Sequence, residues 1–144
     1  DPLWSRGLGD VYKRQCKTPV TAENAAQRLN TIQMNGKETY KQAVTAMLNA
    51  GQTALSLAGV SVEHVACFIP HQANLRIIEA IASRMNVSMD RFMINLDRFG
   101  NTSAAAVAIA LDEAARTGRM NRGDHILMVV FGGGLTWAST VVEW

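Results

Sequence analysis

The sequence lacks the features that mark membrane, secreted and nucleic-acid-binding proteins. No apolar run reaches the ~18 residues that a membrane span needs. The N-terminus, interrupted by Asp1, Arg6 and Asp10, has no apolar stretch of the signal-peptide kind. Fourteen Lys and Arg against twelve Asp and Glu leave a net charge of +2, which is too small and too scattered to indicate nucleic acid as a partner. We therefore expect a cytoplasmic protein with neither a membrane nor a nucleic acid as its partner.

Cysteine is scarce, with Cys16 and Cys67 as the two examples. They form neither a disulfide framework nor a metal-binding spacing, so both are expected to be reduced thiols and no metal site is expected. Cys67 lies inside an apolar run, where no helix N-terminus or base would ionise it, which argues against a role as a nucleophile. The phosphate-loop pattern GxxxxGK[ST] and the pattern GxGxxG are also missing, so nucleotide binding is not indicated.

The composition that remains is that of one globular domain with a sizeable core. Of the 144 residues, 48% are hydrophobic and 18% are charged. The first 15 residues, DPLWSRGLGDVYKRQ, follow neither a helical nor a strand period and differ from the Ala/Val/Ile-rich remainder. We interpret residues 1–15 as a non-native lead-in, such as translated adapter or vector sequence, although a genuine flexible lead-in is the alternative. Residues 16–144 form the domain.

Periodicity predicts an alternation of helices and strands. Helices are expected at 39–57, with Gly59 as the stop, at 74–85 and at 100–118. Strands are expected at 65–70, near 93–96, at 125–131 and at 136–144. This order indicates an α/β fold, with an antiparallel pair joined by the glycine turn at 132–134.

Two of these segments carry further structural detail. VACFIP, residues 65–70, is a continuous apolar run closed by proline, as expected of a strand covered on both faces. The helix at 100–118 is rich in alanine, with Thr102 or Ser103 as its N-cap and Gly118 as its C-cap. Such small side chains allow close packing, so we expect this helix to be buried on more than one side.

Three loops hold candidate functional groups, because ligands of α/β folds gather at the carboxyl ends of strands. His71 follows the strand that Pro70 closes, Asn101 precedes the alanine-rich helix, and three glycines occupy 132–134. Each has an ordinary structural explanation on its own: a histidine bonded to a carbonyl, a turn asparagine and a tight turn. Together they are neutral hydrogen-bond donors suited to an oxygen that gains negative charge. They point to carbonyl chemistry with a nucleophile from elsewhere.

Three stretches closely resemble the C-terminal half of β-ketoacyl-acyl carrier protein synthase III: IPHQANLRII, LDRFGNTSAAAVAIALDEA and FGGGLTWAS. QMNGKETYKQAV is similar to the segment that precedes them in this family, and the resemblance runs in order from Cys16 to Trp144. It implies an α/β, thiolase-like fold, of which this chain is the C-terminal half only. It also implies a decarboxylative condensation of acyl-CoA, with acetyl-CoA as the expected starter, and malonyl-acyl carrier protein that starts fatty acid synthesis.

The resemblance assigns catalytic roles to three residues. His71 of HQAN and Asn101 of GNTS match the family's catalytic histidine and asparagine, which hold the enolate oxygen formed on decarboxylation. Gly133, the middle glycine of FGGG, matches the glycine whose N–H shares an oxyanion hole with the nucleophilic cysteine. The family needs no metal or redox cofactor.

The resemblance also implies binding residues and partners. Asn74 and Gly36 match positions at the pantetheine arm of the substrate, although Lys37 follows Gly36 where some members carry asparagine. Lys41 and Arg76 match basic positions that dock the acidic acyl carrier protein. The structural alternatives are a helix cap for Asn74 and solvated helix charges for the two basic residues. The implied partners are acyl carrier protein, acyl-CoA and a second copy in a homodimer.

One departure from the family is decisive. The nucleophilic cysteine belongs to the N-terminal half, and neither Cys16 nor Cys67 stands at its place, so we expect this chain to be inactive alone. We also expect it to expose apolar surface meant for the missing half and a dimer mate. The alternatives are a related enzyme, such as a chalcone synthase, 3-hydroxy-3-methylglutaryl-CoA synthase or a secondary-metabolite condensing enzyme, and a non-catalytic domain that binds acyl carrier protein or acyl-CoA.

Overall fold

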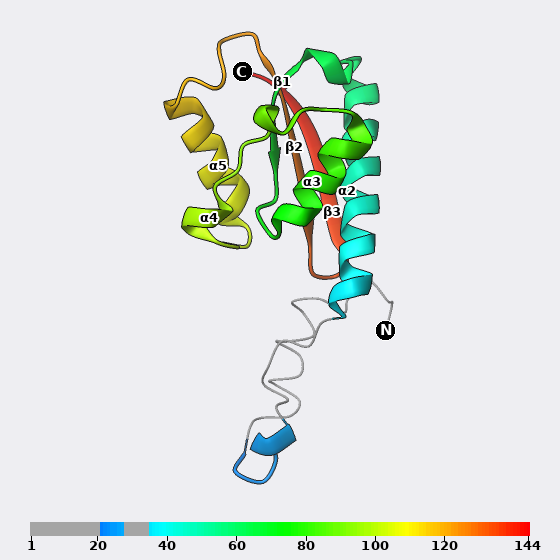
Figure 1. The fold of residues 1–144 in the computed structure, drawn as a ribbon, viewed down its shortest axis with the longest axis vertical. Coiled ribbons are helices and arrows are strands. Elements are labelled where there is room, and N and C mark those ends of the chain that lie inside the picture. Colours follow the sequence, from blue (N-terminus) through cyan, green and yellow to red (C-terminus); the bar gives the residue numbers. More distant parts are fainter. Residues whose placement is uncertain (1–20, 28–34) are drawn as a thin grey trace.

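A computed structural model of the chain describes residues 21–27 and 35–144 (Figure 1). The proposed lead-in at 1–15 and Cys16 lie outside the described residues. In chain order the elements are η2 (Ala25–Gln27), α2 (Gly36–Ala58), η3 (Val62–His64), β1 (Val65–Pro70), α3 (Leu75–Met85), η4 (Met89–Arg91), α4 (Leu96–Phe99), α5 (Ala105–Arg116), β2 (His125–Gly132) and β3 (Thr136–Glu143).

The strands form one mixed sheet in the order β1-β2-β3. β1 runs parallel to β2, with Pro70 opposite Val129 at the carboxyl end. β2 and β3 pair antiparallel down to Gly132 opposite Thr136, which confirms the predicted hairpin across the glycine turn. The β1–β2 crossover contains α3 and α5, as parallel strands require a long connection.

Helix α2 begins and ends at the residues its sequence specifies. The Asn35 side-chain oxygen accepts a hydrogen bond from the Glu38 N–H at 3.2 Å and so caps the first turn. At the other end Gly59 takes the left-handed conformation, with φ 67°, and donates to carbonyls of the last turn. The predicted stop at Gly59 is confirmed, while the helix starts three residues before the predicted Thr39.

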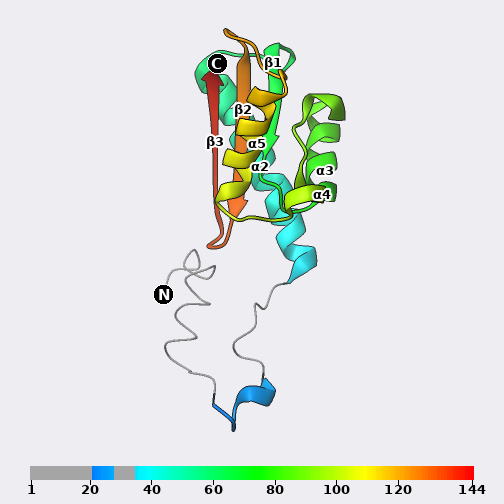
Figure 2. The same ribbon diagram turned by 90° about the vertical axis from the view of Figure 1, so that its left-hand side faces the viewer.

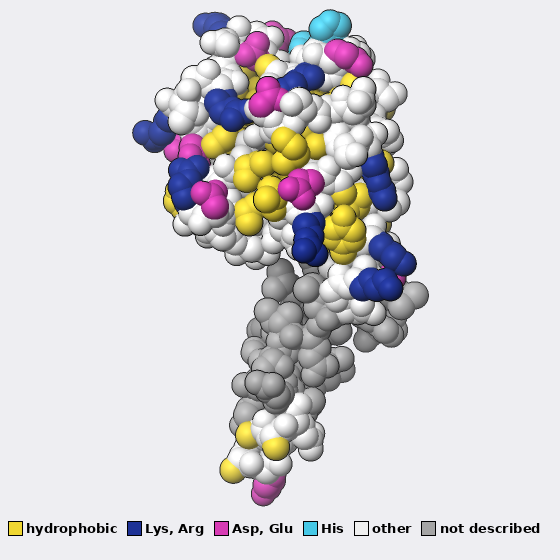
Figure 3. All heavy atoms as spheres, viewed as in Figure 1, with side chains coloured by type: hydrophobic (Ala, Val, Ile, Leu, Met, Phe, Trp, Pro, Cys, Tyr) yellow, Lys and Arg dark blue, Asp and Glu magenta, His cyan; other side chains and the backbone are white. Residues whose placement is uncertain are grey.

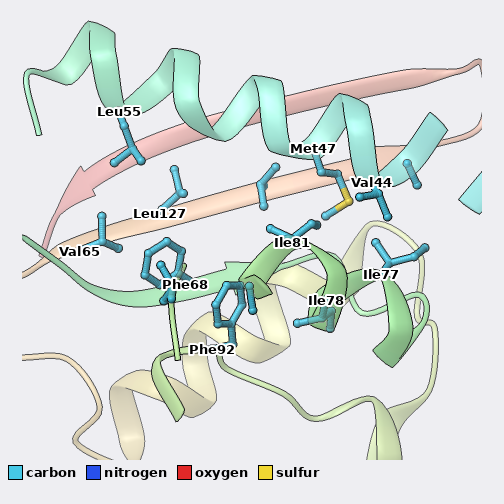
Figure 4. Packing of buried hydrophobic residues seen from close by; sticks show 14 residues of the cluster. Val44, Met47, Leu55, Val65, Phe68, Ile77, Ile78, Ile81, Phe92 and Leu127 are labelled. Atoms are coloured by element: carbon cyan, nitrogen blue, oxygen red, sulfur yellow. The ribbon is translucent and has the colours of Figure 1, made fainter. Parts of the chain in front are cut away.

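The larger core lies between the sheet and the helices α2 and α3, which cover one face (Figures 1 and 2). Its members are packed side by side in Figure 4: Val44, Met47, Leu55, Val65, Phe68, Ile77, Ile78, Ile81, Phe92 and Leu127. Phe68 of β1 stacks on Phe92 with ring centroids 4.8 Å apart, and both residues are buried. Such aromatic pairs add about 0.5–1.5 kcal/mol to the free energy of unfolding beyond their buried area.

A second core lies on the other face of the sheet, beneath α5 (Figure 2). Cys67 and Ile69 of β1 point to this face, and they pack with Ala110 and Ala114 of α5. β1 is therefore covered on both faces, as VACFIP predicted. The expectation that α5 is buried on more than one side was wrong for the described chain, because its buried residues form the single stripe Ala106, Ala110 and Ala114.

The strand predicted near 93–96 is absent from the described structure. This segment makes one parallel bridge to β1, between Phe92 and Phe68, and α4 begins at Leu96. Beyond this bridge, the backbone groups of the segment bond to a side chain and not to a neighbouring strand. The Gln72 amide donates to the Met93 carbonyl at 3.0 Å and accepts from the Asn95 N–H at 3.1 Å. These bonds occupy the backbone groups that a longer strand would have used.

The predicted N-cap of the alanine-rich helix was also wrong. Helix α5 starts at Ala105 with Ala104 at the cap position and no side-chain cap bond. Ser103 has φ 56°, in the left-handed region, because the Asn101 side-chain oxygen draws its N–H into a turn at 3.1 Å. At the far end, Gly118 is left-handed with φ 69°, one residue beyond the Thr117 cap, so it ends the helix as predicted.

Candidate active site

The three predicted loops lie at the same end of the sheet (Figures 1 and 2). β1 and β2 are parallel, so His71, which follows β1, and the turn at 133–135, which follows β2, leave the sheet at the same end. The loop between α4 and α5, which holds Asn101, is at this end too, as is the start of α2 (Figure 1). The fold thus gathers the candidate groups as the carboxyl-end rule predicts.

His71 stands at the end of β1 with its backbone fixed and its ring available. Its N–H donates to the Val129 carbonyl at 2.8 Å, which extends the β1–β2 pairing by one residue. The residue is half-buried, and this burial lowers the pKa of the imidazole below its ordinary value of 6.5. The ring makes no hydrogen bond with the residues that the structure describes. The neutral ring is therefore free to offer a donor to a ligand.

Asn101 is exposed, and its side chain is oriented by the turn that it makes. Its oxygen accepts from the Ser103 N–H, which leaves the amide N–H groups as donors without a partner among residues 21–27 and 35–144. Gly100 precedes it with φ 66°, a conformation that side chains other than glycine rarely adopt. The GNTS sequence thus builds a turn that presents a carboxamide donor.

Gly133 lies in the tip of the β2–β3 hairpin and is exposed. Its carbonyl accepts from the Thr136 hydroxyl at 3.1 Å, which ties the two sides of the turn. The absence of a side chain leaves its backbone approachable from outside.

The four predicted binding residues meet in one open cleft of about 570 Å³, lined by Gly36, Lys37, Tyr40, Lys41, Asn74 and Arg76. It lies between the first turns of α2 and α3, where the Tyr40 hydroxyl donates to the Arg76 carbonyl at 3.4 Å. Asn74 caps α3, because its oxygen accepts from the Arg76 N–H at 2.9 Å. Its structural alternative is therefore confirmed, and the same residue also lines the cleft. A Cβ at Gly36 would meet nothing within 4 Å, so space in the described chain does not demand glycine there.

Sequence reasoning missed a buried polar group beneath the loops. Gln72 is 0% exposed and Asn95 is 1% exposed, and they are joined by a hydrogen bond. The Asn95 amide donates to Glu113 of α5 at 2.9 Å, and Arg98 of α4 donates to the same carboxylate. The Asn95 amide and then Arg98 hold the pKa of Glu113 below its usual value, so it is ionised. The available signal was the polar side chain of Gln72 two residues after an apolar strand.

Large hydrophobic side chains are exposed around the loops. Leu75 follows Asn74, Phe99 precedes Gly100, and Leu135 and Trp137 flank the hairpin, with exposures of 40%, 48%, 40% and 55%. Figure 3 shows apolar atoms gathered at the centre of one face of the chain, with acidic and basic side chains around them. A shallow apolar groove also lies over the uncovered side of β2 and β3, lined by Val107, Met128, Val130, Ala138, Ser139 and Thr140. The expectation of exposed apolar surface is confirmed for the described residues.

Cys67 is buried in the core beneath α5, and burial raises the pKa of its thiol. Such a thiol is unsuited to nucleophilic attack. Among residues 21–27 and 35–144 there is no cluster of three His, Cys, Asp or Glu able to hold a metal ion. The helices within these same ranges include none of the length and hydropathy that a membrane crossing requires.

Comparison with known proteins gives a consistent set of relatives. A family model described as 3-oxoacyl-[acyl-carrier-protein (ACP)] synthase III C terminal matches residues 55–144. The β-ketoacyl-[acyl-carrier-protein] synthase III of Desulfitobacterium hafniense is 50% identical over 126 residues, which cover 88% of this chain and 38% of that protein. The chain thus spans less than half the length of the curated relatives that it matches.

Solved structures agree. The synthase III of Thermus thermophilus superposes with a TM-score of 0.78 at 48% identity, over 80% of this chain and 36% of that one. The priming β-ketosynthase of the R1128 polyketide biosynthetic pathway superposes with a TM-score of 0.73 at 34% identity, over 85% of this chain and 38% of that one. In each case the match is to part of a longer protein.

Proposed function

The chain belongs to the 3-oxoacyl-[acyl-carrier-protein] synthase III family and has the α/β, thiolase-like fold of its C-terminal half, and we propose that it carries the decarboxylation site of such a condensing enzyme. The observation that carries the proposal is the common placement of His71 and Asn101. Both are neutral donors at one end of the sheet, and neither has its donor groups taken by the described residues. Family relatives that share the matched region with 50% identity support the same reading.

The proposed reaction has two stages. First, a cysteine thiolate attacks the carbonyl of acyl-CoA, the tetrahedral oxyanion is held by the cysteine and Gly133 N–H groups, and CoA thiolate leaves. Second, malonyl-acyl carrier protein loses CO₂, and the electron pair of the broken C–C bond becomes an enolate. The enolate carbon attacks the acyl thioester, a C–C bond forms, and the cysteine thiolate leaves. The products are CoA thiolate, CO₂ and β-ketoacyl-acyl carrier protein, so atoms and charge balance, and no metal or redox cofactor is invoked.

The role of His71 and Asn101 in this scheme is to hold the enolate oxygen. Asn101 cannot lose its donor by titration, and the turn to Ser103 already uses its oxygen, so its N–H groups remain as the donor. Burial keeps His71 neutral, and a neutral imidazole can donate one N–H without giving up a full proton. Two such donors favour the enolate over the uncharged thioester, which lowers the barrier to loss of CO₂.

The cleft between α2 and α3 suits the phosphopantetheine arm and its carrier. Lys37, Lys41 and Arg76 line it together with Asn74, which ends the loop that begins at His71. Acyl carrier proteins are acidic, and complementary charge guides such an encounter and fixes its register. We therefore assign Lys41 and Arg76 to docking of the carrier protein, and Asn74 and Gly36 to the arm.

The proposal makes this chain one part of a larger active site. The nucleophile is assigned to a cysteine in the portion of the family's proteins that precedes the matched region, since Cys67 is buried and weakly acidic. The exposed hydrophobic residues around the loops would be buried by contact with that portion. The apolar groove over β2 and β3 would be covered in a homodimer. The chain alone is then inactive. A cytoplasmic location accords with these substrates.

The test is a hybrid enzyme in which residues 16–144 replace the matched region of the Desulfitobacterium hafniense relative. We expect the hybrid to form β-ketoacyl-acyl carrier protein from acyl-CoA and malonyl-acyl carrier protein, and the isolated chain to form none. A soluble, folded hybrid that accepts an acyl group on cysteine yet forms no product would refute the proposal. Product from the isolated chain would refute its dependence on a missing nucleophile.

A role in priming polyketide synthesis is the second candidate, since the R1128 priming β-ketosynthase shares the fold. The higher identity to synthase III proteins, 50% against 34%, favours fatty acid synthesis. A non-catalytic binding domain is the third, and the hybrid test separates it, because such a domain would bind acyl carrier protein without yielding product.

A further inference from the structure

A buried chain of hydrogen bonds begins directly beside His71. The Gln72 amide donates to the Pro70 carbonyl at 2.8 Å and to the Met93 carbonyl at 3.0 Å. The Gln72 side chain therefore links Pro70 and Gln72, the residues on both sides of His71, to Met93 in the segment that follows η4. Because Gln72 is 0% exposed, these bonds are shielded from water and leave the His71 backbone little freedom.

The series of hydrogen bonds continues from Gln72 through Asn95 to helix α5. The Asn95 N–H donates to the Gln72 oxygen at 3.1 Å, and its side-chain amide donates to Glu113 at 2.9 Å. Arg98 donates to the other oxygen of the same carboxylate. Glu113 thus receives one bond from the residue that precedes α4 and one from within α4, a helix of only four residues that could not hold its own position.

The far end of α4 leads into the Asn101 turn. Asn95 stands at the start of α4, where its carbonyl accepts from the Arg98 and Phe99 N–H groups at 3.1 Å each. Gly100 closes the helix with a bond of 2.9 Å to the Leu96 carbonyl, and Asn101 follows at once. The loop itself is exposed, so its position depends on how α4 is fixed.

We propose that Gln72, Asn95 and Glu113 are positioning residues that tie the His71 loop to the Asn101 loop and so set how well the two donors converge on one enolate oxygen. This inference rests on the proposed function. It predicts that the bridge controls the release of CO₂ but not acyl transfer to cysteine, because that transfer uses neither His71 nor Asn101.

The polar identity of the bridge supports this role over simple packing. A buried amide and a carboxylate need partners of defined direction, whereas apolar residues of similar size would fill the same space with less cost. Donor-to-acceptor pairing fixes angles as well as distances. A misplacement of reacting groups by about 1 Å from a mutation outside the chemistry can cost about 100-fold in rate.

The test exchanges the amide and the acid in the hybrid enzyme, once its parent activity is measured. Asn95→Asp sets two carboxylates against each other, and we expect CO₂ release from malonyl-acyl carrier protein to fall by about 10-fold to 100-fold. The rate of acyl-cysteine formation is expected to stay within about twofold. Adding Glu113→Gln restores one hydrogen bond in the opposite direction, so the double variant is expected to recover about tenfold of the loss.

The matched control is Asp112→Asn, which removes an acid beside Glu113 that pairs with Arg116 on the exposed side of α5. Neither half-reaction is expected to change. If Asn95→Asp fails to fold, Glu113→Gln alone is measured, with an expected fall of about threefold to tenfold in CO₂ release because the carboxylate contact with Arg98 is lost.

Three results would overturn the proposed positioning role. CO₂ release could stay unchanged in the folded variants, both half-reactions could fall equally, or the double variant could be no faster than Asn95→Asp. Failure of the proposed function gives a different result. His71→Ala and Asn101→Ala would then leave CO₂ release intact, whereas failure of the bridge alone leaves those two variants impaired.

Discussion

The packed side of the sheet and its loop end are built in opposite ways. Between β1, α2 and α3 the side chains enclose one another, with Phe68 at 1% exposure and Ile78 at 0%. At the loop end, Asn101 and Gly133 are exposed and Trp137 is 55% exposed. The first region is packed by residues of this chain, whereas the second presents exposed polar and aromatic groups.

The contrast indicates which properties this chain can supply by itself. The core determines where the three loops emerge, because β1 and β2 end together and their helices close on both faces. In the proposed function, the loops act together with a nucleophile from another part of the protein. Stability should therefore respond to the first region and turnover to the second.

The largest effect is expected in the core. Phe68→Ala removes a buried ring that stacks on Phe92 and should lower the free energy of unfolding by about 3–5 kcal/mol. Leu57→Ala is the control, since this side chain is 85% exposed and should change stability by less than about 0.5 kcal/mol. Denaturant unfolding of the hybrid enzyme measures both, and equal losses for the two variants would remove the distinction.

The next effect belongs to the loop end. His71→Ala should lower turnover of the hybrid by about 10²-fold to 10³-fold, the usual cost of one oxyanion donor, with little change in unfolding temperature. His64→Ala is the control, because His64 bonds only to Ser61 among its described partners, at the opposite end of β1. Unchanged turnover of the His71→Ala variant would show that His71 is not a donor to the enolate oxygen.

A smaller effect is expected in the cation-lined cleft. Lys41→Glu should raise KM for malonyl-acyl carrier protein by about tenfold and leave KM for acyl-CoA nearly unchanged, because charge reversal weakens the encounter with an acidic carrier. Arg122→Glu makes the same charge change in the turn that precedes β2, away from the cleft. Equal effects of the two reversals would indicate a general charge effect without a docking site.

The smallest effect concerns protonation of His71. Burial lowers its pKa in the folded protein, so its titration midpoint by NMR should lie below 6.5. The unfolded chain takes up the proton first as pH falls, so stability is full above about 6.5 and declines from there down to the lowered folded pKa. His71→Gln should decline less over that window. A midpoint above 6.5 would mean a charged partner stabilises the imidazolium.

The sequence predicted the fold where one signal dominated. VACFIP, the Gly59 stop and the hairpin across 132–134 follow from local pattern, and the structure confirms all three. The segment at 93–96 could not be read this way. Its backbone partner is the Gln72 side chain, 21 residues from Met93, and no periodicity reports such a contact.

Prediction of the site met a similar limit. HQAN, GNTS and FGGG predicted His71, Asn101 and Gly133 as site residues, which stays a prediction, and the structure places their loops at one end of the sheet (Figure 1). Asn95 and Glu113 were given no role from the sequence, since Asn95 lay in a predicted strand and Glu113 is an ordinary charge of a predicted helix. Their pairing exists only through tertiary structure, where burial gives a polar side chain its partner.

The most direct test of the central claim is a double-mutant cycle on His71→Ala and Asn101→Ala, followed by CO₂ release from malonyl-acyl carrier protein in the hybrid. If both donors hold one enolate oxygen, each variant should lose about 10²-fold to 10³-fold, and the double variant should lose far less than the product of the two. Losses that multiply fully, or a single variant without any loss, would contradict a shared oxygen.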